Sequence, residues 1–348
     1  LSLALMETLA DYGTVEYFGV STFTTGIFRT WFGLGDSTTA VQLSAVLMGF
    51  VLMLILLERW SRKRARFHHT SNKYSRIDRY QLKGYRAWLA MTACLLPVFF
   101  GFIFPALQLL VWTFTTAEET LDLSFLVLAG HSLMLASIAA IFAVSLALLL
   151  AYGKRLQNNV ITNSSVRLAS MGYAIPGTVI AMGVLLPLAW LDNTIDTWMR
   201  DNFDISTGLL LSGTLYALIF AYTVRFLSVS IQAVESGLGK IKPSMDDAGR
   251  SLGLTPLAVL RQLHLPLMKG TVLTALLLVF VDVLKELPAT LILRPFNYNT
   301  LAVRAYEMAS DERLADAGAP ALMIVLAGII PVILLSRAIS GSRAGSQT

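Results

Sequence analysis

Apolar runs of about twenty residues recur along the chain and are separated by short polar segments. A membrane-spanning helix needs about 20 mostly apolar residues. Runs of that length predict seven complete spans, near residues 39–57, 87–114, 127–152, 166–190, 207–231, 270–293 and 317–335. A shorter run at residues 1–10 predicts the end of a further helix. The pattern indicates an all-α, polytopic helical membrane protein.

The composition agrees with this interpretation. Of the 348 residues, 55% are hydrophobic and only 14% are charged, whereas a soluble domain carries about 25% charged residues. These values exclude a soluble globular, disordered or fibrous protein. The single cysteine, Cys94, excludes an intramolecular disulfide.

The polar connections between the predicted spans alternate in charge. Residues 59–86 contain ten arginines and lysines against one acid, Asp78, whereas residues 192–204 contain four acids and one base. Because basic connections stay in the cytoplasm, residues 59–86, 153–167, 232–269 and the tail from 336 are expected to be cytoplasmic. The pI near 9.3 therefore reflects membrane topology and contact with membrane lipid, and we expect no nucleic acid partner.

The two ends of the chain align without a gap when residues 1–62 are shifted by 275. The matches include Glu7 with Asp282, Asp11 with Glu286, Arg29 with Arg304, and Ser61-Arg62 with Ser336-Arg337. This predicts a tandem duplication, although any two helical hairpins share some likeness. Residues 1–62 would be the C-terminal remnant of a first repeat, 63–86 a basic cytoplasmic linker, 87–337 a complete second repeat and 338–348 a cytoplasmic tail. Because the sequence begins inside an apolar run, we expect an N-terminally truncated chain.

The longest cytoplasmic connection, about residues 233–268, is predicted to form two short helices. Ser244 is placed to cap the first helix in a capping box with Asp247. Gly253 is expected to end that helix. Thr255 is expected to cap the second helix, with Pro256 at its first position.

This connection resembles the coupling motif of ABC importer permeases, which reads Glu-Ala-Ala, three residues, Gly, nine residues, Ile, one residue, Leu-Pro. The matching positions are Asp247, Ala248, Gly249, Gly253, Leu263, Leu265 and Pro266. The departures are Asp for Glu, Gly for the second Ala and Leu for Ile. An ordinary amphipathic cytoplasmic hairpin is the alternative.

The resemblance implies a type I ABC importer permease fold, with one complete six-helix repeat preceded by the last helix and a half of another. It also implies that the loop docks on separate ATPase subunits, expected to be a homodimer, which bind ATP and Mg. The chain contains no Gly-x-x-x-x-Gly-Lys-Ser/Thr loop for phosphate. It is therefore expected to be a transport subunit without a cofactor or catalytic residues of its own.

Four acids lie within or beside apolar runs, where ionisable groups are costly and usually functional. Asp282 and Glu286 are four residues apart and so share a helix face, and Glu7 and Asp11 occupy the matching positions near the N-terminus. We expect these carboxylates, with Tyr173, to lie beside a translocation path. Carboxylates suit hard cations, although no metal ligand is assigned. The alternative is structural pairing with Lys285 or Arg225.

Longer stretches resemble the fused double permeases for ferric iron. They are residues 7–19, Tyr173-Ala-Ile-Pro-Gly177, 285–290, 293–296 and 309–313. The resemblance implies a bacterial inner-membrane permease for ferric iron that is delivered by a periplasmic binding protein. Related permeases for thiamine, polyamine, sulfate or phosphonate are the closest alternatives. A proton-coupled secondary transporter that uses Asp282 and Glu286 is a third class.

Overall fold

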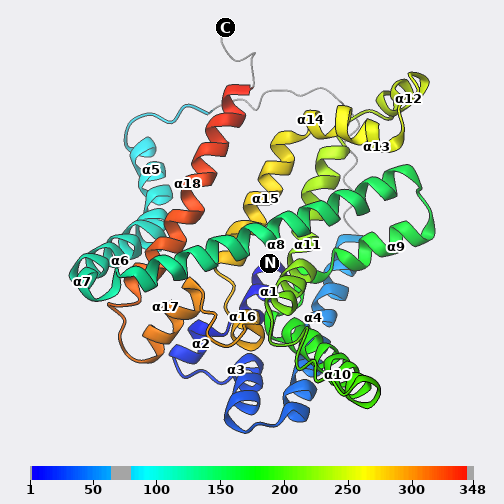
Figure 1. Ribbon diagram of the computed structural model, residues 1–348. Coiled ribbons are helices and arrows are strands. Elements are labelled where there is room, and N and C mark those ends of the chain that lie inside the picture. The colour runs from blue at the N-terminus through cyan, green and yellow to red at the C-terminus, as the bar shows by residue number, and fades with distance from the viewer. Residues whose placement is uncertain (1, 64–79, 343–348) are drawn as a thin grey trace.

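The computed structural model describes residues 2–63 and 80–342, and every regular element in these two ranges is a helix (Figure 1). Most of the predicted basic linker and the end of the predicted tail lie outside the described residues. The elements in chain order are α1 (Ser2–Ala10), α2 (Gly13–Tyr17), α3 (Phe23–Phe28), η1 (Arg29–Gly33), α4 (Ser37–Lys63), α5 (Tyr85–Val98), η2 (Phe99–Ile103), α6 (Phe104–Thr115), α7 (Ala117–Thr120), α8 (Leu123–Leu156), α9 (Val160–Ala169), η3 (Gly172–Ala174), α10 (Gly177–Phe203), α11 (Leu215–Leu238), α12 (Pro243–Ser251), α13 (Pro256–Val259), η4 (Leu260–His264), α14 (Leu265–Leu267), α15 (Lys269–Leu284), α16 (Pro288–Leu293), α17 (Leu301–Ser310) and α18 (Gly318–Ser342).

The predicted spans correspond to long apolar helices. Among the described residues, five helices are long and apolar enough to cross a membrane, in α4, α5–α6, α8, α10 and α11. The number rises to six when Pro256–Leu267 and α15, which meet at a bend of 81°, are counted together as one span. The apolar part of α18, Gly318–Ile333, is shorter. The prediction of an all-α polytopic membrane protein is confirmed.

Two predicted boundaries are wrong. The expected span at residues 166–190 is broken between α9 and α10, and α10 continues to Phe203. The expected span at 207–231 begins only at Leu215. The reason is that Asp192 and Asp196, which the charge pattern assigned to a polar connection between spans, are residues of α10. Their carboxylates accept hydrogen bonds from the backbone N–H groups of residues 207, 208 and 210–212, so the segment before α11 folds back along α10.

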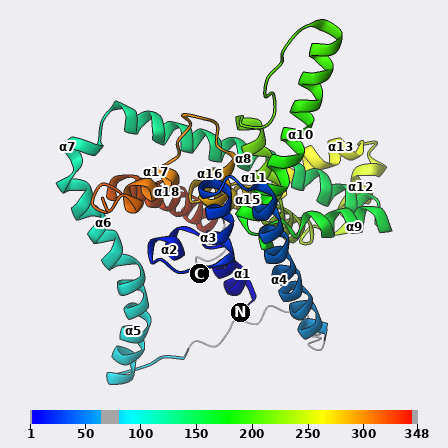
Figure 2. The same ribbon diagram turned by 90° about the horizontal axis from the view of Figure 1, so that it is seen from below.

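The core is centred on α11, which packs against α8 and α15. Its buried side chains include Leu218, Tyr222 and Phe226, and small residues of α8 such as Ala136 and Ala143 allow the two helices to approach closely. By contrast, α5 extends away from the other helices (Figure 2), whereas α6 packs against α18; no residue in the most apolar window of α5–α6 is buried.

The N-terminal and C-terminal segments have the same order of elements. In each, a helix ends, a short helix follows after a break, a second short helix comes next, and a long apolar helix closes the segment. The starts of α2 and α16 differ by 275 residues, those of α3 and α17 by 278, and those of α4 and α18 by 281. The gapless register therefore holds around the first break only, and the duplication itself stays a prediction.

The two regions to which the sequence assigns a function, the coupling loop and the segments near the four acids, lie at opposite ends of the molecule. In Figure 1, α12, α13 and α14 are at the upper right, whereas α2, α3, α16 and α17 are at the lower side. The long helix α8 runs diagonally between these two regions (Figure 1).

Candidate functional site: a charged cavity and a coupling segment

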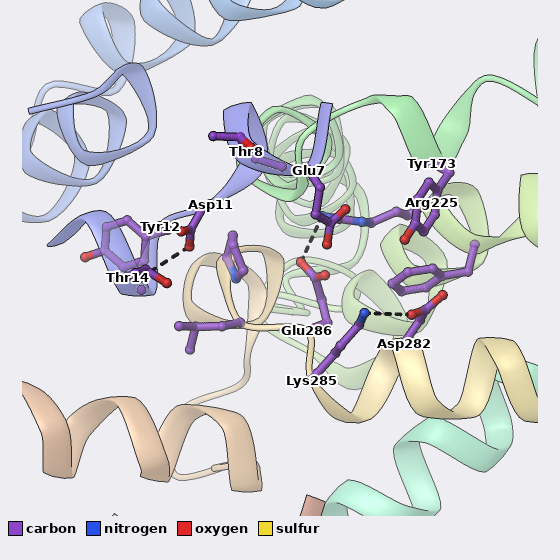
Figure 3. A pocket seen from close by; sticks show the side chains of 15 residues that line it. Glu7, Thr8, Asp11, Tyr12, Thr14, Tyr173, Arg225, Asp282, Lys285 and Glu286 are labelled. Atoms are coloured by element: carbon purple, nitrogen blue, oxygen red, sulfur yellow. Dashed lines mark hydrogen bonds and ion pairs between the residues drawn. The ribbon is translucent and has the colours of Figure 1, made fainter. Parts of the chain in front are cut away.

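A cavity of about 630 Å³ lies between the N-terminal segment and the break after α15 (Figure 3). Its walls include all four acids predicted from the sequence and Tyr173. Its other polar side chains are those of Arg225, Lys285, Tyr12, Thr8 and Thr14. The structure therefore brings Glu7 and Asp11 together with Asp282 and Glu286, which are more than 270 residues away in the sequence.

Helix breaks place these groups in the cavity wall. Residues 285–287 interrupt the helical path between α15 and α16, because Pro288 begins α16 and lacks the N–H group that would continue α15. A second break, at residues 170–176, brings Tyr173 to the cavity. This segment contacts α11, because the backbone N–H of Tyr173 donates to Oγ of Ser228 at 3.0 Å.

The most buried charges in the cavity wall form an ion pair. Nη1 of Arg225 on α11 donates to Oε1 of Glu286 at 3.0 Å, and the two side chains are only 7% and 6% exposed. The pair lies against the backbone of Gly177. A Cβ atom at position 177 would stand 2.2 Å from Nη1 of Arg225 and 2.4 Å from Oε1 of Glu286. Glycine at this position therefore makes room for the ion pair.

The remaining charges are arranged unevenly. Nζ of Lys285 contacts Oδ1 of Asp282 at 3.0 Å, with the lysine about half exposed. Asp11 accepts the backbone N–H of Thr14 at 3.3 Å. Among the side chains that the structure describes, no arginine or lysine forms an ion pair with Glu7 or Asp11. Four carboxylates face two cations, which gives the lining a formal charge of −2.

The acids do not form a fixed coordination site. No group of three or more His, Cys, Asp or Glu side chains in the described part of the chain is close enough to hold a metal ion. Both structural pairings that the sequence left open are present, because Lys285 meets Asp282 and Arg225 meets Glu286. The cavity therefore combines paired and unpaired carboxylates.

The predicted coupling loop forms the helices from α12 to α14, called here the coupling segment. Most of the predictions about where its helices begin and end are confirmed. Gly253 follows α12 and has φ +80°. Its backbone N–H donates to the carbonyl of Arg250, and the backbone N–H of Leu254 donates to the carbonyl of Gly249. This is a Schellman ending, for which glycine is preferred. Thr255 caps α13, with Pro256 at its first position. The expected cap at Ser244 is wrong, because α12 already begins at Pro243, so Lys242 occupies the N-cap position and makes no side-chain cap.

The motif residues divide into a buried and an exposed set. Gly249 is buried, and a Cβ atom there would stand 3.0 Å from Val259 and 3.2 Å from Leu263. The close packing explains why glycine replaces the second alanine of the motif. Leu263 and Leu265 are partly buried, and the exposed positions are Asp247, Ala248, Gly253 and Pro266.

Sequence reasoning missed a buried polar cluster beneath this segment. Oδ2 of Asp246 accepts from Nε of Arg155 at 2.7 Å, and Oδ1 lies 2.6 Å from Nε2 of His264, which is completely buried. Burial alone would raise the pKa of the Asp246 carboxyl, but the bonds to Arg155 and His264 outweigh it and hold the pKa below its usual value. The sequence carried one signal for the burial of Asp246. This residue lies three positions before Gly249 and therefore shares its helix face.

The sequence is similar to those of known transport permeases. The model of the binding-protein-dependent transport system inner membrane component family matches residues 143–341. The "Fe(3+)-transport system permease protein FbpB 2" of Haemophilus influenzae is 29% identical over 96% of this chain, and this chain spans 64% of that relative's length. The "Putative 2-aminoethylphosphonate transport system permease protein PhnV" of Salmonella typhimurium is 28% identical over 37% of this chain and 49% of its own length.

The fold has counterparts among solved structures. A chain of a bacterial ABC transporter involved in the import of the acidic polysaccharide alginate superposes with a TM-score of 0.56 at 12% identity, covering 76% of this chain and 96% of its own. At that identity the likeness concerns the fold alone. The helical fold and the family match define a membrane-embedded permease of the ABC importer class. The chain belongs to the family of binding-protein-dependent transport system inner membrane components, because the family model covers more than half of it.

Proposed function

We propose that this permease carries ferric iron, which a periplasmic binding protein delivers and for which separate ATPase subunits supply the energy. The observation that carries this cargo is the cavity in which four carboxylates face two cations. Hard cations prefer carboxylate oxygen ligands, and a negatively charged cavity concentrates cations. The similarity to an Fe(3+) permease over 96% of the chain supports the same cargo.

The cavity supports attraction and passage of a cation, not a stored ion. Glu7 and Asp11 form no ion pair among the described side chains, and only Glu7 acts on Lys285 at longer range, so their charge is available to a cation that enters the cavity. Asp282 and Glu286 are partly neutralised by Lys285 and Arg225. The role proposed for Tyr173 is to present its ring and hydroxyl at the edge of the same path.

The exposed part of the coupling segment is the proposed contact for an ATPase subunit, with ATP and Mg bound by that partner. Asp247 and Ala248 are exposed beside Met245 and Leu252, which is 82% exposed. Apolar and charged side chains that protrude from a short helix suit a groove on a partner protein. This assignment places the basic connections and the C-terminus in the cytoplasm of a bacterium.

The test is reconstitution of the permease with its ATPase subunit and binding protein in liposomes. Uptake of radiolabelled ferric iron should require ATP inside and loaded binding protein outside. Liposomes that contain a non-hydrolysable ATP analogue are the control. ATP hydrolysis without iron uptake would reject ferric iron and favour a thiamine, polyamine, sulfate or phosphonate cargo. Uptake without ATP would instead favour a proton-coupled secondary transporter.

A further inference from the structure

The last turn of α8 holds both halves of the coupling segment. Arg155 binds Asp246 on α12, and the hydroxyl of Tyr152 donates to the carbonyl of Pro256 at the start of α13 at 2.8 Å. Tyr152 and Arg155 are three residues apart and so share one face of α8. The ring of Tyr152 also packs edge-on against His264, with centroids 5.3 Å apart.

Arg155 connects three elements at once. Besides the bond from Nε to Asp246, Nη1 donates to the carbonyl of Leu238 at 2.6 Å and Nη2 donates to the carbonyl of Ile241 at 2.9 Å. Leu238 is the last residue of α11, where carbonyl groups lack partners within the helix and a cation is favoured. A planar guanidinium with several fixed donors can make all of these bonds, whereas a lysine cannot.

The coupling motif does not include Tyr152, Arg155, Asp246 or His264. The motif positions are Asp247 to Gly249, Gly253, Leu263, Leu265 and Pro266, whereas Asp246 directly precedes the motif, His264 lies between two of its positions, and both are buried. A buried ion pair costs desolvation, and it is tolerated when its geometry is good and its other hydrogen-bonding groups are satisfied. The bonds of Arg155 and Asp246 meet that condition, and they hold the segment in one orientation.

The other end of α8 contacts the opposite side of the molecule. Oγ of Ser132 accepts from the backbone N–H of Leu301 at 2.8 Å, and the hydroxyl of Tyr298 donates to the carbonyl of His131 at 3.1 Å. The rings of His131 and Tyr298 are stacked at 4.4 Å. Ser132 and Tyr152 are twenty residues apart in one continuous helix, which separates the two sets of contacts by about 30 Å.

We propose that Tyr152, Arg155, Asp246 and His264 form a rigid joint through which α8 moves with the coupling segment and carries that movement to residues 298–301. These four residues, called here the coupling joint, are positioning residues that fix the angle between the coupling segment and α8. Residues 298–301 follow α16, whose first residue, Pro288, lines the charged cavity. The inference rests on the proposed function, since it requires an ATPase partner at the coupling segment.

The test compares single substitutions in the joint with a neighbour on the same helix. Arg155→Gln, Arg155→Lys and Asp246→Asn loosen the joint. Lys154→Gln is the matched control, because Lys154 forms an ion pair with Glu235, both side chains being 35% exposed, that also joins α8 to α11 but does not touch α12 to α14. Each variant is reconstituted with ATPase subunit and binding protein, and uptake of radiolabelled ferric iron is divided by ATP hydrolysed in the same vesicles.

The expected result is a fall of roughly tenfold in uptake per ATP for Arg155→Gln and Asp246→Asn. A smaller fall is expected for Arg155→Lys, and none for Lys154→Gln. The double variant Arg155→Gln/Asp246→Asn should be no worse than either single variant, because it leaves no charge unpaired. A purely structural role would lower the amount of assembled protein without changing the ratio. An unchanged ratio in Arg155→Gln and Asp246→Asn, or an equal fall in Lys154→Gln, would overturn the proposal.

A second measurement does not depend on the cargo. Thr14 lines the charged cavity, and the native Cys94 is replaced by serine so that Thr14→Cys carries the only thiol. The labelling rate at position 14 by a membrane-impermeant reagent should change when ATP is trapped, and Asp246→Asn, which is nearly isosteric, should abolish that change. If the unsubstituted assembly shows no response to ATP, the proposed function fails. If Asp246→Asn responds as the parent does, only the joint fails.

Discussion

The two walls of the charged cavity have the same local backbone but different electrostatics. In the N-terminal segment, Asp11 accepts the N–H of Thr14 at 3.3 Å, and in the C-terminal segment Glu286 accepts the N–H of Ala289 at 3.2 Å. These positions differ by 275 residues in both cases, since 286 − 11 and 289 − 14 are both 275. Each acid thus stands one residue before the N-cap position and accepts an N–H of the first turn of the short helix that follows a break.

The difference lies in the partners. Glu286 is buried and bound to Arg225, whereas Asp11 is partly exposed and has no cation within ion-pair distance in the described ranges. Asp282 pairs with Lys285, three residues further along the chain. No lysine or arginine stands at a comparable distance in the sequence from Glu7 or Asp11. The comparison teaches that one backbone arrangement supports a structural ion pair in the C-terminal segment and leaves available charge in the N-terminal segment.

The largest expected effect is the loss of Arg225. Arg225→Gln leaves Glu286 buried without its cation, which typically costs about 3–5 kcal/mol. Thermal unfolding of the purified protein in detergent should show this loss. Lys285→Gln is the matched control, because Lys285 is 53% exposed in its pair with Asp282, and an ion pair with an exposed partner is typically worth at most about 1 kcal/mol. Equal destabilisation by the two variants would remove the distinction between the walls.

Gly177→Ala should disturb the same ion pair from the other side. The added methyl group would overlap Arg225 and Glu286, and forcing extra volume into a packed site costs about 1–3 kcal/mol. Gly183, one turn and a half further along α10, has open space around its Cα. Gly183→Ala should therefore stabilise the protein by up to about 1 kcal/mol through helix propensity. Denaturation of both variants would show whether space at position 177 matters.

Neutralising the unpaired wall should affect uptake more than stability. Glu7→Gln/Asp11→Asn removes the charge that has no internal partner, and we expect cation uptake to fall roughly tenfold, with the free energy of unfolding changed by less than about 0.5 kcal/mol. Glu118→Gln/Glu119→Gln, in the exposed α7, makes the same change of charge away from the cavity. Unchanged uptake in the cavity variant would assign Glu7 and Asp11 a structural role only.

The smallest expected effect concerns the hydrogen bond that Asp11 accepts at the start of α2. Asp11→Ala removes this acceptor and should cost about 1 kcal/mol, whereas Asp11→Asn keeps an oxygen and should cost much less. Unfolding curves of the two variants measure the difference. A loss as large as that in Arg225→Gln would mean that Asp11, like Glu286, is mainly structural.

Several features of the fold and the site were predictable from local sequence. Gly253 and Thr255-Pro256 marked the end of one helix and the start of the next, because a left-handed residue and an N-cap depend on neighbouring backbone only. The pair Glu7 and Asp11 was placed beside Asp282 and Glu286 by matching positions in the sequence. The cavity was therefore predicted in outline, although its volume and its breaks were not.

Other features depended on contacts between distant residues. The helix α10 continues past Trp190 because the carboxylates of Asp192 and Asp196 bind backbone N–H groups of residues 207–212. Hydropathy counts those aspartates only as polar and so ends the helix too early. Arg155 read as one more cytoplasmic base, although it binds Asp246, 91 residues away.

The sequence by itself determined that this chain is a helical membrane permease, because apolar length and the spacing of the coupling motif are local properties of the chain. It also predicted that Glu7, Asp11, Asp282 and Glu286 lie near one another. Only the tertiary structure decided which of these acids are neutralised and which residues hold the coupling segment. The physical reason is that an ion pair depends on the few ångströms between side chains from different helices, and neither residue's own neighbours in the sequence specify that distance.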